Sequence, residues 1–401
     1  MKPVVKNYSV LVIGELLSRG LYYIAFIYMA RLISVEGLGI LSFTQSLVSY
    51  FALLATFGLD ITGARDAAKG DVASGKLLAN ILVLKVIFSV VSFLLLLFTV
   101  VLINKPLETK SFIIIYGIVL MINILQLDWF FQGLEKMYII SALQSLRALF
   151  IVILLFIFVK GAENFLTVAW IFTISPLIVT PLSLYFVKRD NLVTRLVFDF
   201  NFSKKLFKES YPVILIHLMA LIYYNIDAVM LAFLTNDRSV GIYSAAYKVI
   251  LLAISLNVFW QYACTPKLSK HPFDKKVFLE YALTNILIGF FFSVAVYIWS
   301  KEIILFLYGE SYIQSVEILR VLSIVPFSSA LAGTFANTLT LWNLQRLQLI
   351  ATSAGAVSNV ALNFLLIPQY SLNGAAIATI AAELLVFFLS FLFLYNRLFK
   401  L

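Results

Sequence analysis

The stretch LLANILVLKVIFSVVSFLLLLFTVVLI, residues 77–103, decides the fold class. It holds 27 residues and a single charged side chain, Lys85. A transmembrane helix needs about 20 apolar residues, and soluble core helices rarely offer such a run. Because lipid offers the backbone no hydrogen-bonding partner, the stretch must satisfy its own peptide groups. We therefore predict a membrane-spanning helix.

Eleven further apolar stretches show the same pattern, and strand-like alternation is absent from them. The whole composition agrees, because 62% of the 401 residues are hydrophobic and only 12% are charged, about half the usual share in soluble proteins. We expect an all-α polytopic membrane protein with 12 transmembrane helices, which excludes a soluble enzyme, a secreted disulfide scaffold and a disordered chain. The predicted spans are 8–33, 38–58, 77–103, 111–131, 138–159, 165–187, 210–234, 241–263, 280–299, 316–341, 347–367 and 373–395.

The distribution of lysine and arginine predicts the orientation in the membrane. With the N-terminus inside, nineteen of the 30 Lys and Arg residues fall in inside segments and five in outside segments. Cytoplasmic loops carry such an excess, so both termini are expected in the cytoplasm. The same excess accounts for most of the net charge of +10, and no nucleic-acid partner is expected.

The longest inside connection, residues 188–209, divides the spans into two sets of six. We predict two domains, 1–195 and 196–401, each a six-helix bundle with the same orientation. An internal repeat is supported by a shift of 202 residues, which lays ARLISVEGLGILS (30–42) over AFLTNDRSVGIYS (232–244). Two such bundles commonly enclose a cavity and transport by rocking against each other.

Charged side chains inside the spans are the candidate functional residues, because a charge at the bilayer centre costs at least about 2.5–3.5 kcal/mol. Basic side chains would receive phosphate, arginine through two parallel hydrogen bonds and lysine as a point charge. Buried carboxylates would carry a coupling proton or pair with these cations. The predicted substrate-binding residues are Arg19, Lys85, Arg147 and Lys248, and the predicted coupling or charge-pair residues are Glu15, Asp227 and Glu383.

Several of these candidates also have a structural interpretation. Glu15 and Arg19 lie four residues apart, so they share a helix face and can form a neutralising pair. Lys85 and Arg147 lie about eight or nine residues from a span end, within partial reach of the interface. Asp128, near a span end, is expected to be an interfacial anchor.

The candidate residues of the second half also have both a functional and a structural interpretation. Lys248 can reach the outer interface or pair with Asp227, whereas Glu383 lies deepest in its span. Tyrosines such as Tyr223 and Tyr224 either belong to the interfacial aromatic belt or stack on sugar rings in a cavity.

Several catalytic signatures are missing from the sequence. It contains no P-loop motif, so ATP hydrolysis by that route is excluded. One cysteine, Cys264, and two histidines rule out a disulfide within the chain and a cysteine- or histidine-based metal centre, and no cofactor is expected. The longest outside loop is about residues 300–315, too short for a catalytic module. We therefore do not expect an enzyme.

Five stretches carry a resemblance to a known family. They stand in order along essentially the whole chain: ARLISVEGLGILSFTQSLVSYFALLATFGLDITGARDAA at 30–68, DWFFQGLEKM at 128–137, DAVMLAFLTNDRSVGIYSAAYKV at 227–249, ILFLYGESYIQS at 304–315 and NFLLIPQYSLNGAAIAT at 363–379. In these the chain resembles the polysaccharide transporters, or O-antigen-type flippases, of the multidrug/oligosaccharidyl-lipid/polysaccharide (MOP) exporter superfamily. Twelve spans favour this branch over the lipid II flippases.

The resemblance implies a fold, a cargo and a location. It implies a MATE-like fold and a flippase of the bacterial inner membrane. The implied cargo is an undecaprenyl-pyrophosphate-linked oligosaccharide for O-antigen, lipopolysaccharide, capsule or exopolysaccharide. The sugar would cross through the cavity while the prenyl tail stays in lipid. Coupling to a proton or sodium gradient, and work beside a polysaccharide polymerase and a chain-length regulator, are implied as well.

Three other functions remain open at this point. A cation-coupled drug or metabolite exporter of the same superfamily would use acidic and aromatic cavity residues, and the four basic candidates argue for anionic cargo instead. A membrane glycosyltransferase or polymerase would need larger outer loops. A scaffold without transport activity would not depend on single intramembrane charges.

Overall fold

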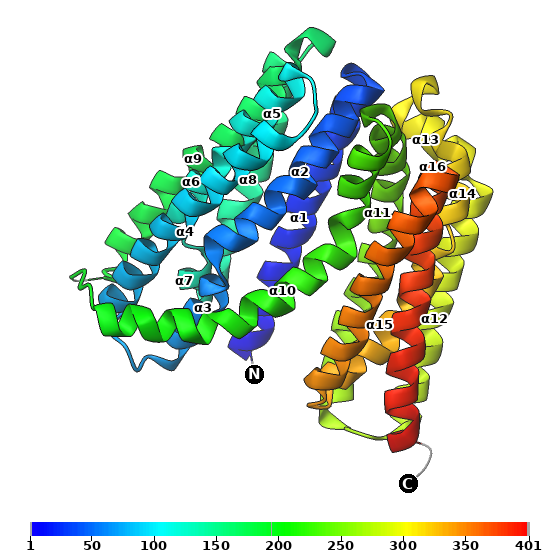
Figure 1. The fold of residues 1–401 in the computed structure, drawn as a ribbon. Helices are drawn as coiled ribbons and strands as arrows, with labels where there is room; N and C mark the ends of the chain where they lie inside the picture. The colour runs from blue at the N-terminus through cyan, green and yellow to red at the C-terminus, as the bar shows by residue number, and fades with distance from the viewer. Residues whose placement is uncertain (1, 194, 399–401) are drawn as a thin grey trace. The chain divides into compact units, whose positions relative to one another are not determined.

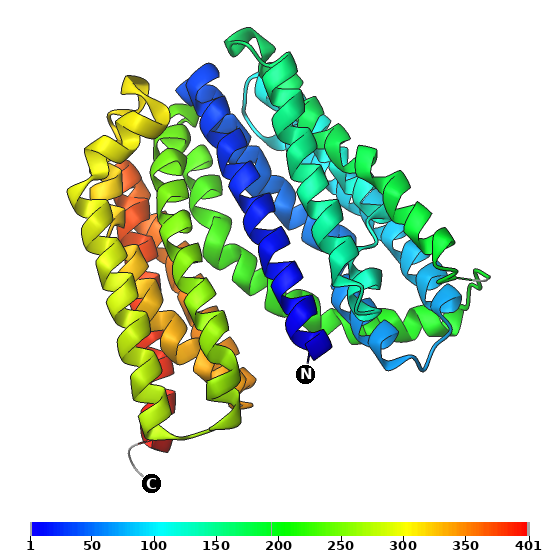
Figure 2. The ribbon, with the colours of Figure 1, turned by 180° about the vertical axis from the view of Figure 1, so that it is seen from behind.

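The computed structural model describes residues 2–193 and 195–398, and every regular element within these ranges is a helix (Figures 1 and 2). The chain forms two compact units, each described here by itself. The first comprises residues 1–34 and 47–218, and the second comprises residues 35–46 and 219–401. Two helices contribute residues to both units, α2 (Val35–Thr56) and α10 (Phe200–Leu234).

The first unit is an all-helical bundle in which α1 packs along α8, and α9 packs against both α8 and α5. A left-handed pair of residues, Phe57 and Gly58, ends α2 and turns the chain into the short α3. The other helices of this unit are α1 (Lys2–Leu32), α3 (Leu59–Lys69), α4 (Ser74–Leu102), α5 (Leu107–Gly117), α6 (Val119–Ile122), α7 (Asp128–Gly133), α8 (Met137–Phe158) and α9 (Phe165–Arg189), with short 3-10 turns at Asn123–Leu125 and Ala162–Asn164.

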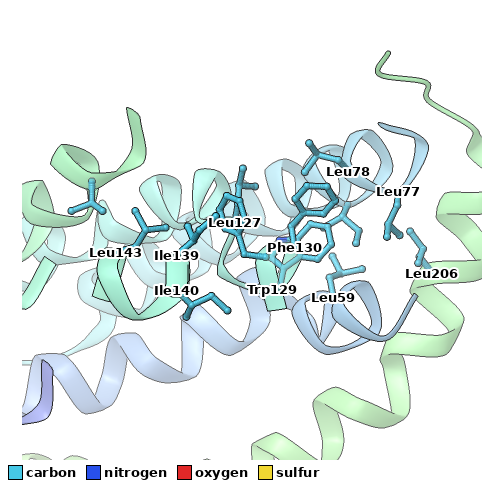
Figure 3. Close-up of a cluster of buried hydrophobic side chains, with 13 residues drawn as sticks. Leu59, Leu77, Leu78, Leu127, Trp129, Phe130, Ile139, Ile140, Leu143 and Leu206 are labelled. Carbon is cyan, nitrogen blue, oxygen red and sulfur yellow. The ribbon is translucent and has the colours of Figure 1, made fainter. Parts of the chain in front are cut away.

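The hydrophobic core of the first unit gathers around α7 (Figure 3). Trp129 and Phe130 lie among Leu59 of α3 and Leu77 of α4, and all four side chains are buried. Leu206, from the first half of α10, packs into the same cluster. The stretch DWFFQGLEKM therefore supplies core packing, and it joins the connection between the predicted halves to the first unit.

The second unit is also all-helical. In it α15 packs against α12 and α16, and α11 packs against α12, α14 and α15. Its further helices are α11 (Asp237–Lys270), α12 (Lys275–Ile298), α13 (Ser300–Tyr308), α14 (Ser315–Leu322), α15 (Val325–Leu341) and α16 (Gln345–Leu398), with a 3-10 turn at Glu310–Tyr312. Ser371 has non-helical backbone angles inside α16 (φ 51°, ψ −125°), which divides this helix into two arms.

The predicted repeat is visible where the start of α2 meets the start of α11. A Cβ atom on Gly39 would lie 1.8 Å from the carbonyl oxygen of Asp237, and one on Gly241 would lie 2.0 Å from that of Val35. Both partners are displaced by the same 202 residues, so the two contacts are equivalent. Glu36 and Arg238, also 202 residues apart, form an ion pair of 2.9 Å. We call this contact the glycine seam; it has local two-fold symmetry.

Within residues 2–193 and 195–398, ten helical runs are long and apolar enough to cross a membrane, where the sequence predicts twelve spans. The difference lies at the two ends of the chain. The first predicted span falls within α1, which carries Glu15 and Arg19 and is not among the ten. The last two fall in one run, Gln345–Tyr395. At 1.5 Å per residue this run is long enough to cross a core of about 30 Å twice, and Ser371 lies between the two predicted spans.

The compact units differ from the predicted domains 1–195 and 196–401 in two segments. Residues 35–46 belong to the second unit because the glycine seam holds them there. Residues 196–218 belong to the first unit because Leu206 and its neighbours pack on α3 and α4.

Candidate transport site

Glu15 and Arg19 form the ion pair that their spacing predicts on α1. The Arg19 side chain nevertheless keeps 48% of its surface exposed. The pair is therefore a partly open one, in which the guanidinium still has free faces for a further anion.

Lys85 is buried on α4, with only 2% of its side chain exposed, and its Nζ lies 2.5 Å from Oδ1 of Asp60 on α3. The carboxylate of Asp60 is 40% exposed. A carboxylate from a neighbouring helix therefore neutralises Lys85.

Arg147 of α8 lies in a polar cluster with Asp128 of α7. Its Nη2 is 3.8 Å from Oδ2 of Asp128, a loose ion pair, and its Nε is buried without a hydrogen-bond partner. Tyr22 of α1 lies within electrostatic range of both charges. Asp128, which we expect to be an interfacial anchor, also forms this loose ion pair with Arg147. An incompletely satisfied guanidinium of this kind favours an additional anion.

Asp227 lies at the centre of a buried hydrogen-bond cluster in the second unit. Its carboxylate accepts from Tyr243 Oη at 2.9 Å, from Thr379 Oγ1 at 2.7 Å and from Asn363 Nδ2 at 2.6 Å. Asn363 Nδ2 also donates to Asn359 Oδ1 at 2.9 Å. These groups come from α10, α11 and both arms of α16, so the turn at Ser371 brings them together.

The Asp227 cluster is rich in oxygen atoms. Within the described part of the chain, no ion pair is recorded for Asp227, and Oδ1 of Asn363 is buried without a partner. Carboxylate, amide and hydroxyl oxygens are the ligands that hard cations prefer. The same carboxylate is also a potential proton carrier.

A polar cavity of about 110 Å³ opens beside this cluster in the second unit. The half-buried Lys248 lines it together with Asp227. The structure therefore brings these two predicted residues to one cavity. Its other lining residues are Ser42, Gln45, Ser46, Tyr224, Asn225, Ala228, Tyr243, Ser244, Tyr247 and Leu251.

Glu383 is buried on the second arm of α16, beside Tyr223 and Ser329. It does not line the cavity of Asp227 and Lys248. Glu15, Arg19, Lys85 and Arg147 all lie in the first unit, and Asp227, Lys248 and Glu383 lie in the second.

Sequence reasoning missed five side chains that complete these clusters, Asp60, Tyr243, Asn359, Asn363 and Thr379. Two signals point to the cluster around Asp227. Asn359 and Asn363 are amides four residues apart in an apolar span, a costly placement that needs partners. The stretch 363–379 also begins and ends on members of the cluster.

Comparison with known proteins places the chain among relatives of one kind. Residues 4–271 match the family described as polysaccharide biosynthesis proteins. A protein of Escherichia coli (strain K12), described as a candidate O-antigen transporter, is 24% identical over 388 residues, covering 93% of this chain and 92% of its own. A protein of Shigella dysenteriae with the same description is 23% identical over 378 residues, covering 91% and 93%.

Solved structures show the same fold. The lipid II flippase MurJ in an inward closed conformation superposes with a TM-score of 0.79 at 16% identity, over 96% of this chain and 87% of that one. An inward-facing MATE multidrug resistance transporter of the MOP superfamily gives 0.77 at 16% identity, over 94% of each chain. These likenesses confirm the predicted fold class.

Proposed function

The chain belongs to the polysaccharide biosynthesis protein family, and from this premise we propose that it is a flippase for a lipid-linked oligosaccharide. The observation that carries the proposal is the alignment of more than nine-tenths of the chain with candidate O-antigen transporters. The likeness in fold to the lipid II flippase MurJ supports it. The family is one of transporters, as the sequence predicts, and not of enzymes.

The finer proposal concerns the cargo and its setting. The cargo is an undecaprenyl-pyrophosphate-linked repeat unit of O-antigen, capsule or exopolysaccharide, carried from the cytoplasmic to the outer leaflet of the inner membrane. The chain spans this membrane many times, and both termini lie in the cytoplasm. A polysaccharide polymerase and a chain-length regulator are the expected protein partners.

Arg147 and Arg19 of the first unit and, separately, Lys248 of the second unit are each proposed to contact the pyrophosphate. Arg147 is the strongest, because its Nε lacks a partner and Asp128 pairs with it only at 3.8 Å. Arg19 offers an exposed guanidinium, and Lys248 lines a polar cavity. Lys85 is the weakest member of the predicted set, because Asp60 already neutralises it.

The coupling ion, a proton or sodium, is proposed to act at Asp227. Its three neutral donors and the amide oxygen of Asn363 supply a site that gains from one added positive charge. Glu383, buried without a recorded ion pair among the described residues, is the second candidate carboxylate, and Glu15 stays a charge-pair residue. In a rocking-bundle mechanism the cation would offset part of the cargo's negative charge.

The test is transport in cells and in vesicles. A deletion strain should accumulate lipid-linked repeat units on the cytoplasmic face of the membrane, and the wild-type gene should restore export. Arg147→Ala should lower export at least about tenfold, the loss of one charge-assisted hydrogen bond, with unchanged protein in the membrane. Arg238→Ala, an arginine of the glycine seam, is the matched control. Accumulation on the outer face, or normal export by Arg147→Ala, would contradict the proposal or the assigned residue respectively.

A second candidate function is cation-coupled export of drugs or small molecules. The observation in its favour is the fold shared with a MATE multidrug resistance transporter, together with the acidic cluster at Asp227. It predicts that the deletion strain becomes sensitive to organic cations while its surface glycan stays normal. The flippase predicts the reverse, so one pair of measurements separates the two.

A further inference from the structure

The connection between the predicted halves is fixed to the first unit by a fully satisfied buried amide. Asn80 of α4 donates through Nδ2 to the carbonyl of Val197 at 3.0 Å and to that of Lys76 at 2.6 Å. Its Oδ1 accepts from the backbone N–H of Asp199 at 3.0 Å and from Ser203 Oγ at 2.7 Å. Every hydrogen-bonding position of this amide is used, so the connection is held in one place.

Ion pairs complete the attachment. Lys76 Nζ lies 2.6 Å from Oδ2 of Asp199, which also caps the start of α10, and Arg65 pairs with Glu209. These salt bridges lie outside the spans predicted from sequence, 77–103 and 210–234, and the Lys76 ammonium, with the capping amide, lowers the pKa of Asp199. Lys76 and Arg65 of the first unit are thus neutralised by carboxylates of the connection.

The opposite face of the same helix is basic. Leu206 and Ser210 are buried against the unit, whereas Lys204, Lys205 and Lys208 are exposed. Among the described residues, the nearest acidic group recorded for these three is Glu209, 3.8 Å from Lys205. We call Lys204, Lys205 and Lys208 the basic face.

An apolar flank lies beside the basic face. Phe200 is 72% exposed and Tyr211 is 53% exposed, and eleven residues, about three turns, place them on one side of the helix. Figures 1 and 2 show this half of α10 crossing the ends of α4 and α9 transversely, within the first unit. A helix that lies across a bundle of membrane spans, with aromatic side chains beside lysines, has the composition of a helix in the membrane interface.

We propose that the basic face of α10 binds the phosphate headgroups of anionic phospholipids, with Phe200 and Tyr211 inserted at the acyl boundary. Lysines close to an anionic leaflet each contribute about fivefold in affinity. The surface does not depend on the cargo or on transport, so it extends beyond the proposed flippase function.

The shape of the surface favours phospholipid over a diphosphate cargo. The three lysines project from the exposed face of a single helix. Specific recognition of a diphosphate needs donors that converge on it, as in backbone nests and arginine forks. Separate point charges on long stems suit a changing population of singly charged headgroups.

The experiment measures lipids retained by the purified full-length protein. The protein is placed in nanodiscs of equal parts phosphatidylglycerol and phosphatidylcholine, and native mass spectrometry counts the bound lipids at low and high salt. Lys204→Gln/Lys205→Gln/Lys208→Gln should reduce phosphatidylglycerol retention at least about tenfold at low salt. The charge-conserving Lys204→Arg/Lys205→Arg/Lys208→Arg should retain it. Phe200→Ser should weaken retention of both lipids, independently of salt.

A matched control removes the same charge elsewhere on the predicted inside face, as Lys270→Gln/Lys275→Gln/Lys276→Gln at the turn between α11 and α12. This variant should change retention less than about threefold. Equal losses in both triple variants would overturn the proposal in favour of a general charge effect. Loss of undecaprenyl diphosphate binding with unchanged phosphatidylglycerol retention would also overturn it, and would assign the face to the cargo.

Discussion

Asp227 shows at the scale of one residue how a buried charge is retained in a membrane protein. A carboxylate without partners in lipid is costly, but three donors within 2.9 Å compensate much of that cost. None of these donors is a cation, so the site can still gain from an added positive charge. That property distinguishes Asp227 from Lys85, whose charge Asp60 already neutralises.

Asp227→Asn should therefore abolish the dependence of transport on the ion gradient. The asparagine can still hydrogen-bond to its neighbours, so the protein should remain in the membrane at normal amount. Flipping should fall at least about tenfold if the coupling charge is required. Reconstituted vesicles with and without imposed proton or sodium gradients provide the measurement. Glu280→Gln, which removes an exposed carboxylate paired with Lys267, should behave as wild type.

Residue positions were predictable from the sequence, whereas their partners were not. The cost of charge in lipid marks Lys85, Arg147 and Asp227 without any structure. Which carboxylate meets Lys85 depends on how α3 packs on α4, and Asp60 lies outside every span of high hydropathy. Lys248 and Asp227, whose pairing the sequence left open, line one cavity.

At the scale of elements, the glycine seam explains why segment 35–46 packs with the second unit. Small residues allow two helix starts to approach until their backbones touch. Gly39 and Gly241 do this in equivalent positions, each against a carbonyl oxygen of the other segment. No side chain larger than hydrogen fits at either position without a shift of the helices.

Gly39→Ala and Gly241→Ala should each destabilise the protein by about 1–3 kcal/mol, the usual cost of overpacking. The two effects should be similar in size because the contacts are related by the repeat. Thermal unfolding in detergent gives the measurement. Gly20→Ala in α1 is the control, since a Cβ there meets nothing within 4 Å. Wild-type stability in both seam variants would refute the close approach.

A second element-scale prediction concerns the end of α9. Hydrogen bonds from Arg189 and then from Lys136 lower the pKa of Asp190 from 3.8 to about 2. A depressed carboxyl pKa stabilises the fold above the unfolded value, and that contribution is lost as the pH falls from about 4 towards 2. Asp190→Asn should have a lower unfolding temperature than wild type at pH 6. The difference between the two unfolding temperatures should be smaller at pH 2. A difference that stays constant with pH would contradict the pairing.

Most helix positions followed from hydropathy, and the exceptions have physical reasons. The first predicted span lies in α1, which carries Glu15 and Arg19 and is not among the ten apolar runs found in the described residues. The break at Ser371 agrees with the predicted boundary between the last two spans. The transverse first half of α10 was missed, because its attachment depends on Asn80, more than a hundred residues away in the chain.

At the scale of the whole molecule, each predicted half contributes a segment to the compact unit that holds most of the other half. Fragments 1–195 and 196–401 should therefore restore export only when both are expressed, since residues 35–46 and 196–218 would otherwise lack their packing partners. Complementation of a deletion strain by one or both fragments is the measurement. Fragments made by dividing the chain inside the turn 271–274 provide a comparison, because this turn lies within one unit. Full export from either fragment alone would contradict this organisation.

The ion pair between Glu36 and Arg238 lies on the symmetry axis of the glycine seam. In an assembly of two identical copies, a residue on such an axis faces its own duplicate, so any charge there would meet the same charge and repel it. Only a single polypeptide, in which two equivalent positions are encoded separately, can carry opposite charges at that point. Self-association of identical copies could not form this pair, and exchanging the two charges should leave it intact.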